Sequence, residues 1–355
     1  MTQDQFSSLQ VLSFGAGALG TYIAGSLALH GHKVIFLERQ QVAEELHESG
    51  LRLVIAGKEH TLLDINVVGS LVEALKLGPF DVAIFALKSF DTAKALASLA
   101  PYAEDLPPIL CLQNGVDNES TIAEVLGSNM VIPGTVTSAI GRRAAGDIVL
   151  ERLRGMGVAA GHPLSLRLVT ALDASGLNAR LYKNAASMKW SKLLTNLIGN
   201  ATSAILDMTP AEIFAHEGLY RLELAQLREC LAIMEAQNIH PVDLPGTPVR
   251  LLAFAVKSLP AVMSRPLLRR AIGKGRGAKM PSFHIDLHAG RGQSEADYLN
   301  GAIVRAGLRL GLPTPVNQIL TDTLLNLTTG ALQIEEFAHQ PGRLLAKVPE
   351  IVNVK

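Results

Sequence analysis

The sequence contains little cysteine, few aromatic residues and no net charge. Its only cysteines, Cys111 and Cys230, lie far apart without Cys-x-x-Cys spacing, so no disulfide framework or cysteine-based zinc site is indicated. The formal net charge is +0, and only 18% of residues are charged, which gives no overall field to attract nucleic acid or an anionic membrane. We therefore expect small-molecule partners and no binding to nucleic acid or membranes.

Long apolar runs and a targeting segment are also missing. The best candidate for a membrane span, residues 249–259, has 11 residues and includes Lys257. It falls short of the roughly 20 apolar residues that a span requires. Residues 1–10 are polar and lack the basic flank and cleavage site of a signal peptide. Together with the sparse cysteines, these features predict a cytoplasmic protein.

A chain of 355 residues exceeds the size at which one hydrophobic core keeps growing, so we expect two domains. Strand-like apolar runs alternate with helical patterns in the first part, at residues 10–14, 34–37, 81–87 and 109–112. This alternation predicts a Rossmann-type doubly wound α/β sheet over residues 1–175, which residues 141–161 are expected to complete. Amphipathic helical patterns follow, and they predict an all-α substrate and dimerisation domain over residues 176–355.

A glycine-rich loop connects the first predicted strand to the first predicted helix. Its residues are Gly15, Ala16, Gly17, Ala18, Leu19 and Gly20. In this setting the first glycine allows a tight turn, the second lets backbone approach a pyrophosphate, and the third permits close helix packing. The helix N-terminus would hold the phosphates, so the loop predicts dinucleotide binding.

Two residues at the end of the second predicted strand bear on the choice of coenzyme. A carboxylate at this point binds the ribose 2′-hydroxyl of NAD, whereas an arginine can hold the 2′-phosphate of NADP. The sequence has Glu38 and Arg39 side by side. From these residues alone, both coenzymes remain open.

Lys88 and Asn114 follow two further buried strands. Ligands of open α/β sheets bind at the carboxyl ends of the strands, so a cation and an amide there suit a nicotinamide ribose and a substrate oxygen. The alternative is a solvated lysine and an asparagine that only forms a turn before Gly115.

The second predicted domain begins with a helical segment over residues 188–200. Lys192, Asn196 and Asn200 recur every four residues and are predicted to share one helix face. A half-buried lysine can lose proton affinity and act as a general acid, while two amides can orient a carboxylate or hydroxyl. Lys189, in contrast, is expected on a solvated face.

Three polar features lie closer to the C-terminus. Glu295 precedes a helix predicted over residues 298–310, and its alternative role is a first-turn carboxylate favoured by the helix dipole, which suits Asp297 better. His284 and His288 have the i, i+4 spacing of a metal-binding pair. Because no acidic or histidine partner is evident nearby in the sequence, we predict no metal site.

These segments together resemble the ketopantoate reductase (2-dehydropantoate 2-reductase) family from residue 11 to about residue 315. The similar stretches are Gly-Ala-Gly-Ala-Leu-Gly at 15–20, Ala-Leu-Lys-Ser-Phe-Asp at 86–91, Leu-Gln-Asn-Gly-Val at 112–116, Lys-Trp-Ser-Lys-Leu-Leu-Thr-Asn at 189–196, Ser-Phe-His-Ile-Asp at 282–286, and Ser-Glu-Ala-Asp-Tyr-Leu-Asn-Gly at 294–301. Their common order and spacing are more specific than any one motif.

The resemblance implies an enzyme that reduces 2-dehydropantoate to (R)-pantoate with NADPH, a step of pantothenate and coenzyme A biosynthesis. It also implies a role for each matching residue: Lys192 as proton donor, Asn196, Asn200 and Ser282 as substrate ligands, Asn114 as a ligand of substrate and cofactor, and Lys88 and Glu295 on the nicotinamide side. Arg39 would then hold the 2′-phosphate of NADP.

Three departures from the family pattern concern the substrate. Pro210-Ala211 replaces an Asn-Gly pair, the proline-rich, basic segment 241–280 is longer than in compact members, and the loop from Ser282 to Glu295 is slightly extended. A related NAD(P)-dependent reductase of another 2-oxo acid is therefore an alternative. A non-enzymatic nucleotide-sensing module, with the basic run 265–279 as a docking surface, is a second one. Alanine- and leucine-rich helices in the second domain would suit a homodimer.

Overall fold

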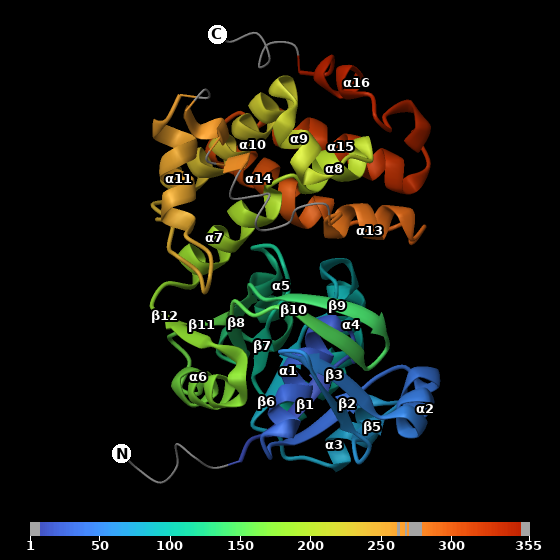
Figure 1. The fold of residues 1–355 in the computed structure, drawn as a ribbon. Coiled ribbons are helices and arrows are strands. Elements are labelled where there is room, and N and C mark those ends of the chain that lie inside the picture. Colours follow the sequence, from blue (N-terminus) through green and yellow to red (C-terminus); the bar gives the residue numbers. More distant parts are fainter. Residues whose placement is uncertain (1–7, 261–262, 267, 270–278, 349–355) are drawn as a thin grey trace. The chain divides into compact units, whose positions relative to one another are not determined.

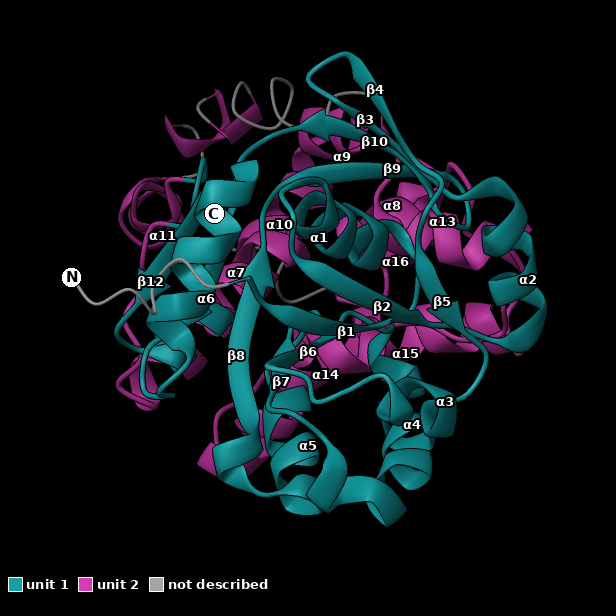
Figure 2. Cartoon of the chain, turned by 90° about the horizontal axis from the view of Figure 1, so that it is seen from below, with its two compact units in different colours: residues 1–189, 244–247 teal, residues 190–243, 248–355 magenta. Residues whose placement is uncertain are grey.

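The computed structural model describes residues 8–260, 263–266, 268–269 and 279–348. The chain divides into two compact units, shown in different colours in Figure 2. Unit 1 comprises Met1–Lys189 with Leu244–Thr247, and unit 2 comprises Trp190–Asp243 with Pro248–Lys355. The first unit reaches beyond residue 175 because the strand Ala179–Tyr182 belongs to its sheet.

Unit 1 is built on an eight-stranded sheet with the order β12-β11-β8-β7-β6-β1-β2-β5 (Figure 1). Its strands are β1 (Gln10–Phe14), β2 (Lys33–Leu37), β5 (Asn66–Val68), β6 (Val82–Phe85), β7 (Ile109–Cys111), β8 (Val131–Val136), β11 (Met156–Ala159) and β12 (Ala179–Tyr182). The six strands from β8 to β5 are parallel, whereas β11 is antiparallel to β8. This confirms the predicted doubly wound sheet.

Alternation along the strands explains why these runs are apolar throughout. Val11 and Ile84 belong to one core cluster, and their neighbours Leu12 and Phe85 belong to a second one. Successive side chains of a strand point to opposite faces, so both faces of this sheet are buried. The helices of the unit are α1 (Ala18–Leu29), α2 (Gln40–Ser49), α3 (Leu71–Lys76), α4 (Thr92–Leu99), α5 (Asn118–Leu126) and α6 (Ser165–Leu172).

A second, smaller sheet has the order β4-β3-β10-β9. It consists of β3 (Leu51–Ile55), β4 (Lys58–Leu62), β9 (Ala139–Ala144) and β10 (Asp147–Arg152). The expectation that residues 141–161 complete the main sheet is therefore wrong for β9 and β10, and only β11 joins it. The reason is that β10 pairs with β3, where Leu53 and Ile148 are fully buried in the core cluster that includes α1.

Unit 2 has helices and no strand within its described residues. They are α7 (Ala185–Leu197, whose first residues belong to unit 1), α8 (Asn200–Leu206), α9 (Pro210–Ala215), α10 (Glu217–Ala236), α11 (Val249–Ser258), α13 (Ser282–His288), α14 (Ala296–Leu310), α15 (Pro315–Thr329) and α16 (Pro341–Leu345). Unit 2 is thus helical, as predicted, but the prediction of an all-α range over residues 176–355 is wrong at its start, because Ala179–Tyr182 forms strand β12. Much of the basic run 265–279, including Arg270, Lys274 and Arg276, lies outside the described residues. Across the described part of the chain, no helix has both the length and the apolar character needed to cross a membrane.

Candidate active site

The glycine-rich loop has the geometry that each glycine position requires. Gly15 has φ 90°, which favours glycine, and a Cβ on Gly20 would lie 2.1 Å from the carbonyl oxygen of Gly15. A Cβ on Gly17 would meet nothing within 4 Å. Gly17 is also the N-cap of α1, and no side chain caps that helix end. The open approach to an uncapped helix N-terminus fits the pyrophosphate of a dinucleotide.

Glu38 and Arg39 differ in how they lie beside this loop. The Glu38 carboxylate accepts a hydrogen bond from the backbone N–H of Ala16 through Oε1 at 2.5 Å. Its Oε2 accepts one from the backbone N–H of Arg39 at 3.2 Å. Arg39 is the N-cap residue of α2 and is exposed. The carboxylate therefore lies against the glycine loop, where an adenosine ribose binds in this fold.

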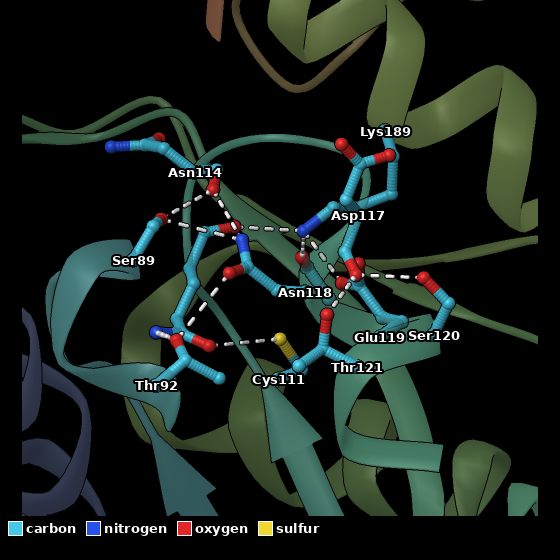
Figure 3. Close-up of polar contacts among 12 residues, drawn as sticks. Ser89, Thr92, Cys111, Asn114, Asp117, Asn118, Glu119, Ser120, Thr121 and Lys189 are labelled. Atoms are coloured by element: carbon cyan, nitrogen blue, oxygen red, sulfur yellow. Dashed lines mark hydrogen bonds and ion pairs between the residues drawn. The ribbon is translucent and has the colours of Figure 1, made fainter. Parts of the chain in front are cut away.

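A buried hydrogen-bond network fixes the chain after β6 and β7 (Figure 3). The side-chain amide of Gln113 donates to the carbonyl oxygens of Leu87 (3.1 Å) and Lys88 (3.3 Å) and to Thr92 Oγ1 (2.8 Å). The carbonyl oxygen of Asn114 accepts from Ser89 Oγ at 2.9 Å and Asn118 Nδ2 at 2.6 Å.

This network brings the segments of Lys88 and Asn114 together at the carboxyl edge of the sheet. Their backbone carbonyls are held by Gln113 and by Ser89 and Asn118, while the Asn114 side chain points away from the network in Figure 3. Both residues are partly buried. Because their backbone is held in this way, the side chains of Lys88 and Asn114 are well placed to bind a ligand. Gln113 and Asn118 were not singled out from the sequence, because the contacts that join them to the segment after β6 span more than twenty residues.

Lys189 is not solvent-facing, contrary to the expectation from the sequence. It is 5% exposed, and its Nζ lies 2.6 Å from Glu119 Oε1 and donates to the carbonyl oxygen of Gln113 at 2.7 Å. Burial by itself lowers the pKa of Lys189, but the Glu119 carboxylate outweighs it and leaves the pKa above its ordinary value. The first residues of α7, which belong to unit 1, are thereby joined to α5 by a buried ion pair.

Lys192 and Asn196 lie on α7, but Asn200 does not, so the prediction of one continuous helix is wrong. The helix ends at Leu197, and Asn200 is the first residue of α8. Between them Gly199 has φ 59°, a left-handed conformation that interrupts a right-handed helix. The break is supported by Glu223 of α10, a fully buried carboxylate that accepts from Gly199 N at 2.8 Å and Thr202 Oγ1 at 2.5 Å.

Asn200 and Ser282 are nevertheless brought together in unit 2. Asn200 Oδ1 accepts a hydrogen bond from the backbone N–H of Phe283 at 3.2 Å, and Ser282 is the first residue of α13. Asn196 and Asn200 are both buried, whereas Lys192 is partly buried. The amide of Asn200 thus has a structural contact besides any ligand that it binds.

Glu295 occupies the N-cap position of α14 and is 2% exposed. Its alternative role as a surface carboxylate in the first turn belongs instead to Asp297, which pairs with Arg305 at 2.8 Å. Burial thus distinguishes the Glu295 carboxylate from the exposed carboxylate of Asp297.

Comparison with known proteins covers both units of the chain. The model of the ketopantoate reductase PanE/ApbA family matches residues 11–160, and the model of its C-terminal domain matches residues 184–328. The chain belongs to the ketopantoate reductase family. Members of this family are oxidoreductases, and so is this chain. The first matched range includes the glycine loop, Lys88 and Asn114, and the second includes Lys192 to Glu295.

Individual relatives agree with this family. A 2-dehydropantoate 2-reductase of Mesorhizobium japonicum is 27% identical over 86% of this chain and 94% of its own length. A crystal structure of a PanE/ApbA family ketopantoate reductase from Ralstonia eutropha has a TM-score of 0.76 at 26% identity, covering 91% of this chain and 99% of that one. D-mandelate dehydrogenase, solved with NADH and anilino(oxo)acetate, has a TM-score of 0.73 at 23% identity, with coverages of 90% and 99%, and shows the same fold.

Proposed function

We propose that this chain reduces the ketone of a 2-oxo acid with a nicotinamide coenzyme, and that 2-dehydropantoate is the substrate, giving (R)-pantoate. The observation that carries the proposal is the match of both family domains to the two halves of the chain, each containing its expected polar residues. Such a step belongs to pantothenate and coenzyme A biosynthesis.

The side chains provide the groups that this reaction needs. The bound coenzyme supplies a hydride to the carbonyl carbon, which leaves negative charge on the carbonyl oxygen. Lys192 Nζ stabilises that charge and donates the proton that completes the alcohol. Asn196, Asn200 and Ser282 orient the substrate's carboxylate and hydroxyl groups, Asn114 contacts both substrate and coenzyme, and Lys88 and Glu295 hold the nicotinamide side.

The coenzyme proposal has two candidates. The family resemblance favours NADPH, for which Arg39 is the cation that pairs with the 2′-phosphate. The contact of Glu38 with the Ala16 N–H supports NADH, because a carboxylate beside the glycine loop opposes a 2′-phosphate. D-mandelate dehydrogenase, of the same fold, is a protein solved with NADH.

Two single variants separate these candidates. If NADPH is the coenzyme, Arg39→Ala lowers kcat/KM for NADPH by about 10- to 100-fold, the value of a charge-assisted hydrogen bond, and leaves kcat/KM for NADH unchanged. If NADH is the coenzyme, Glu38→Gln lowers kcat/KM for NADH, and it does so by more than Arg39→Ala lowers kcat/KM for either coenzyme.

A bulkier 2-oxo acid is the second candidate substrate. Pro210, which stands where other members have asparagine, is buried at the start of α9 and packs against Gly199 beside Asn200. It replaces an amide with an apolar ring. The ternary structure of D-mandelate dehydrogenase contains anilino(oxo)acetate, an aryl-bearing oxo acid.

A panel of 2-oxo acids tests the substrate proposal directly. We expect substrate-dependent coenzyme oxidation with the highest kcat/KM on 2-dehydropantoate. A higher kcat/KM on branched or aryl oxo acids would transfer the assignment to the second candidate. Absence of turnover on every member would leave the nucleotide-sensing alternative and contradict the enzymatic proposal.

We also propose a homodimer. Leu251 and Phe254 of α11 are 64% and 56% exposed, and such apolar side chains are candidates for a subunit contact. Sedimentation of the wild type against Leu251→Glu tests this proposal, because the variant should sediment as a monomer.

A further inference from the structure

Three side chains from separate parts of unit 2 meet at the end of α8. His284 and His288 lie one turn apart on α13, and Asp207 is the residue that ends α8. His284 Nε2 lies 2.7 Å from Asp207 Oδ1, and His288 Nε2 lies 3.9 Å from the same oxygen. The histidine pair is therefore joined in the fold by a carboxylate that lies more than seventy residues away in the sequence.

A third histidine borders this group. His339 Nε2 lies 3.7 Å from Asp207 Oδ2, the second oxygen of the carboxylate. Its backbone N–H donates to the carbonyl oxygen of Leu206 at 2.7 Å, which holds the segment beside the end of α8. Asp207 and His339 both have left-handed backbone conformations, with φ 49° and 55°.

The spacing of the donor atoms suits one tetrahedral metal ion. Metal–nitrogen and metal–oxygen bonds of about 2.0 Å at tetrahedral angles put neighbouring ligand atoms about 3.3 Å apart. The observed separations of 2.7 and 3.9 Å bracket this value, and one ligand atom from each of Asp207, His284 and His288 lies within 4.8 Å of the others. The imidazole rings of the pair are stacked, with centroids 4.0 Å apart, so both nitrogens are presented side by side.

We propose that Asp207, His284 and His288 form a binding site for a divalent transition metal of the Zn²⁺ type. Two imidazoles with one carboxylate are ligands that Zn²⁺ takes in proteins, whereas Mg²⁺ and Ca²⁺ prefer oxygen ligands alone. The carboxylate supplies the one negative charge of the site, which stabilises the cation.

Metal binding would cross-link α8 and α13. Asn200 at the start of α8 already contacts Phe283 of α13 through its side chain, and Ser282 begins that helix. A metal at Asp207 fixes the other end of α8 to α13. Asp207, His284 and His288 are not among the residues assigned to the proposed reaction, so this proposal does not depend on it.

Zinc binding by tag-free protein tests the proposal. After treatment with a chelator and buffer exchange, the chain is titrated with Zn²⁺ against a chromophoric competitor. We expect one Zn²⁺ per chain, and His284→Gln or His288→Gln should each weaken binding by about 10- to 100-fold. His240→Gln is the matched control, because His240 is an exposed histidine of the same unit outside the cluster.

Two further measurements distinguish loss of metal binding from misfolding and identify the ligands of the metal. Zn²⁺ should raise the melting temperature of wild-type protein and not that of His288→Gln, whose partly exposed side chain leaves the fold intact. X-ray absorption at the zinc edge should show imidazole ligands, fewer in His288→Gln. Binding that stays unchanged in His284→Gln and His288→Gln, or no binding by the wild type, would overturn the proposal.

Discussion

At the scale of single residues, Lys189 and Glu119 form a buried ion pair. Both side chains are largely buried, at 6% and 15% exposure, and the Nζ–Oε1 distance is 2.6 Å. A buried charge that loses its partner costs far more than the intact pair contributes. The pair therefore matters for the stability of unit 1, to which the first residues of α7 belong.

Replacement of Lys189 by methionine should destabilise the protein by about 3–5 kcal/mol, because Glu119 is left buried without its cation. Denaturant unfolding measures this loss. Lys189→Met combined with Glu119→Leu should recover much of the stability, and Lys183→Met, at an exposed lysine nearby, should have little effect. Equal losses for the single and the double variant would argue against the ion pair.

The raised pKa of Lys189 also predicts a pH dependence. A lysine whose pKa is higher in the folded than in the unfolded state stabilises fully below its unfolded pKa of about 10.4. This stabilisation is lost as pH rises through the folded pKa. Between neutral pH and pH values above 10.4, the wild type should lose more unfolding free energy than the Lys189→Met, Glu119→Leu double variant. A parallel loss in both proteins would contradict this origin.

At the scale of elements, the sequence predicts the parallel strands better than it predicts the helix ends. Buried strands are apolar on both faces, so β1 and β6 are recognisable from composition alone. The break before Asn200 depends on Gly199 and on a carboxylate from α10, Glu223, which no local pattern reveals. Burial of Lys189 likewise depends on groups more than fifty residues away.

The glycine loop predicts different outcomes for two similar substitutions. In Gly20→Ala the new Cβ would collide with the Gly15 carbonyl, so the melting temperature and coenzyme affinity should both fall. In Gly17→Ala the Cβ meets no protein atom, so the protein should melt like the wild type while the coenzyme dissociation constant rises. Thermal melts and fluorescence titration check both. Unaltered coenzyme binding in Gly17→Ala would place the pyrophosphate elsewhere.

At the scale of the whole molecule, each unit contributes a distinct part of the proposed reaction. Unit 1 contains the glycine loop, Lys88 and Asn114, and unit 2 contains the amides and Lys192. The two family domains match these two parts of the chain in the same order. The proposed metal site could not be predicted from the sequence, since Asp207 and the pair His284 and His288 come together only through the packing of α8 and α13.

The central claim is that Lys192 donates the proton during reduction of a 2-oxo acid. Its most direct test is the steady-state rate of Lys192→Ala on 2-dehydropantoate, with circular dichroism and coenzyme binding as checks on the fold. Loss of a general acid should lower kcat by about 10²- to 10⁴-fold while both checks stay at the wild-type level. A variant that retains wild-type kcat would contradict the assignment of Lys192.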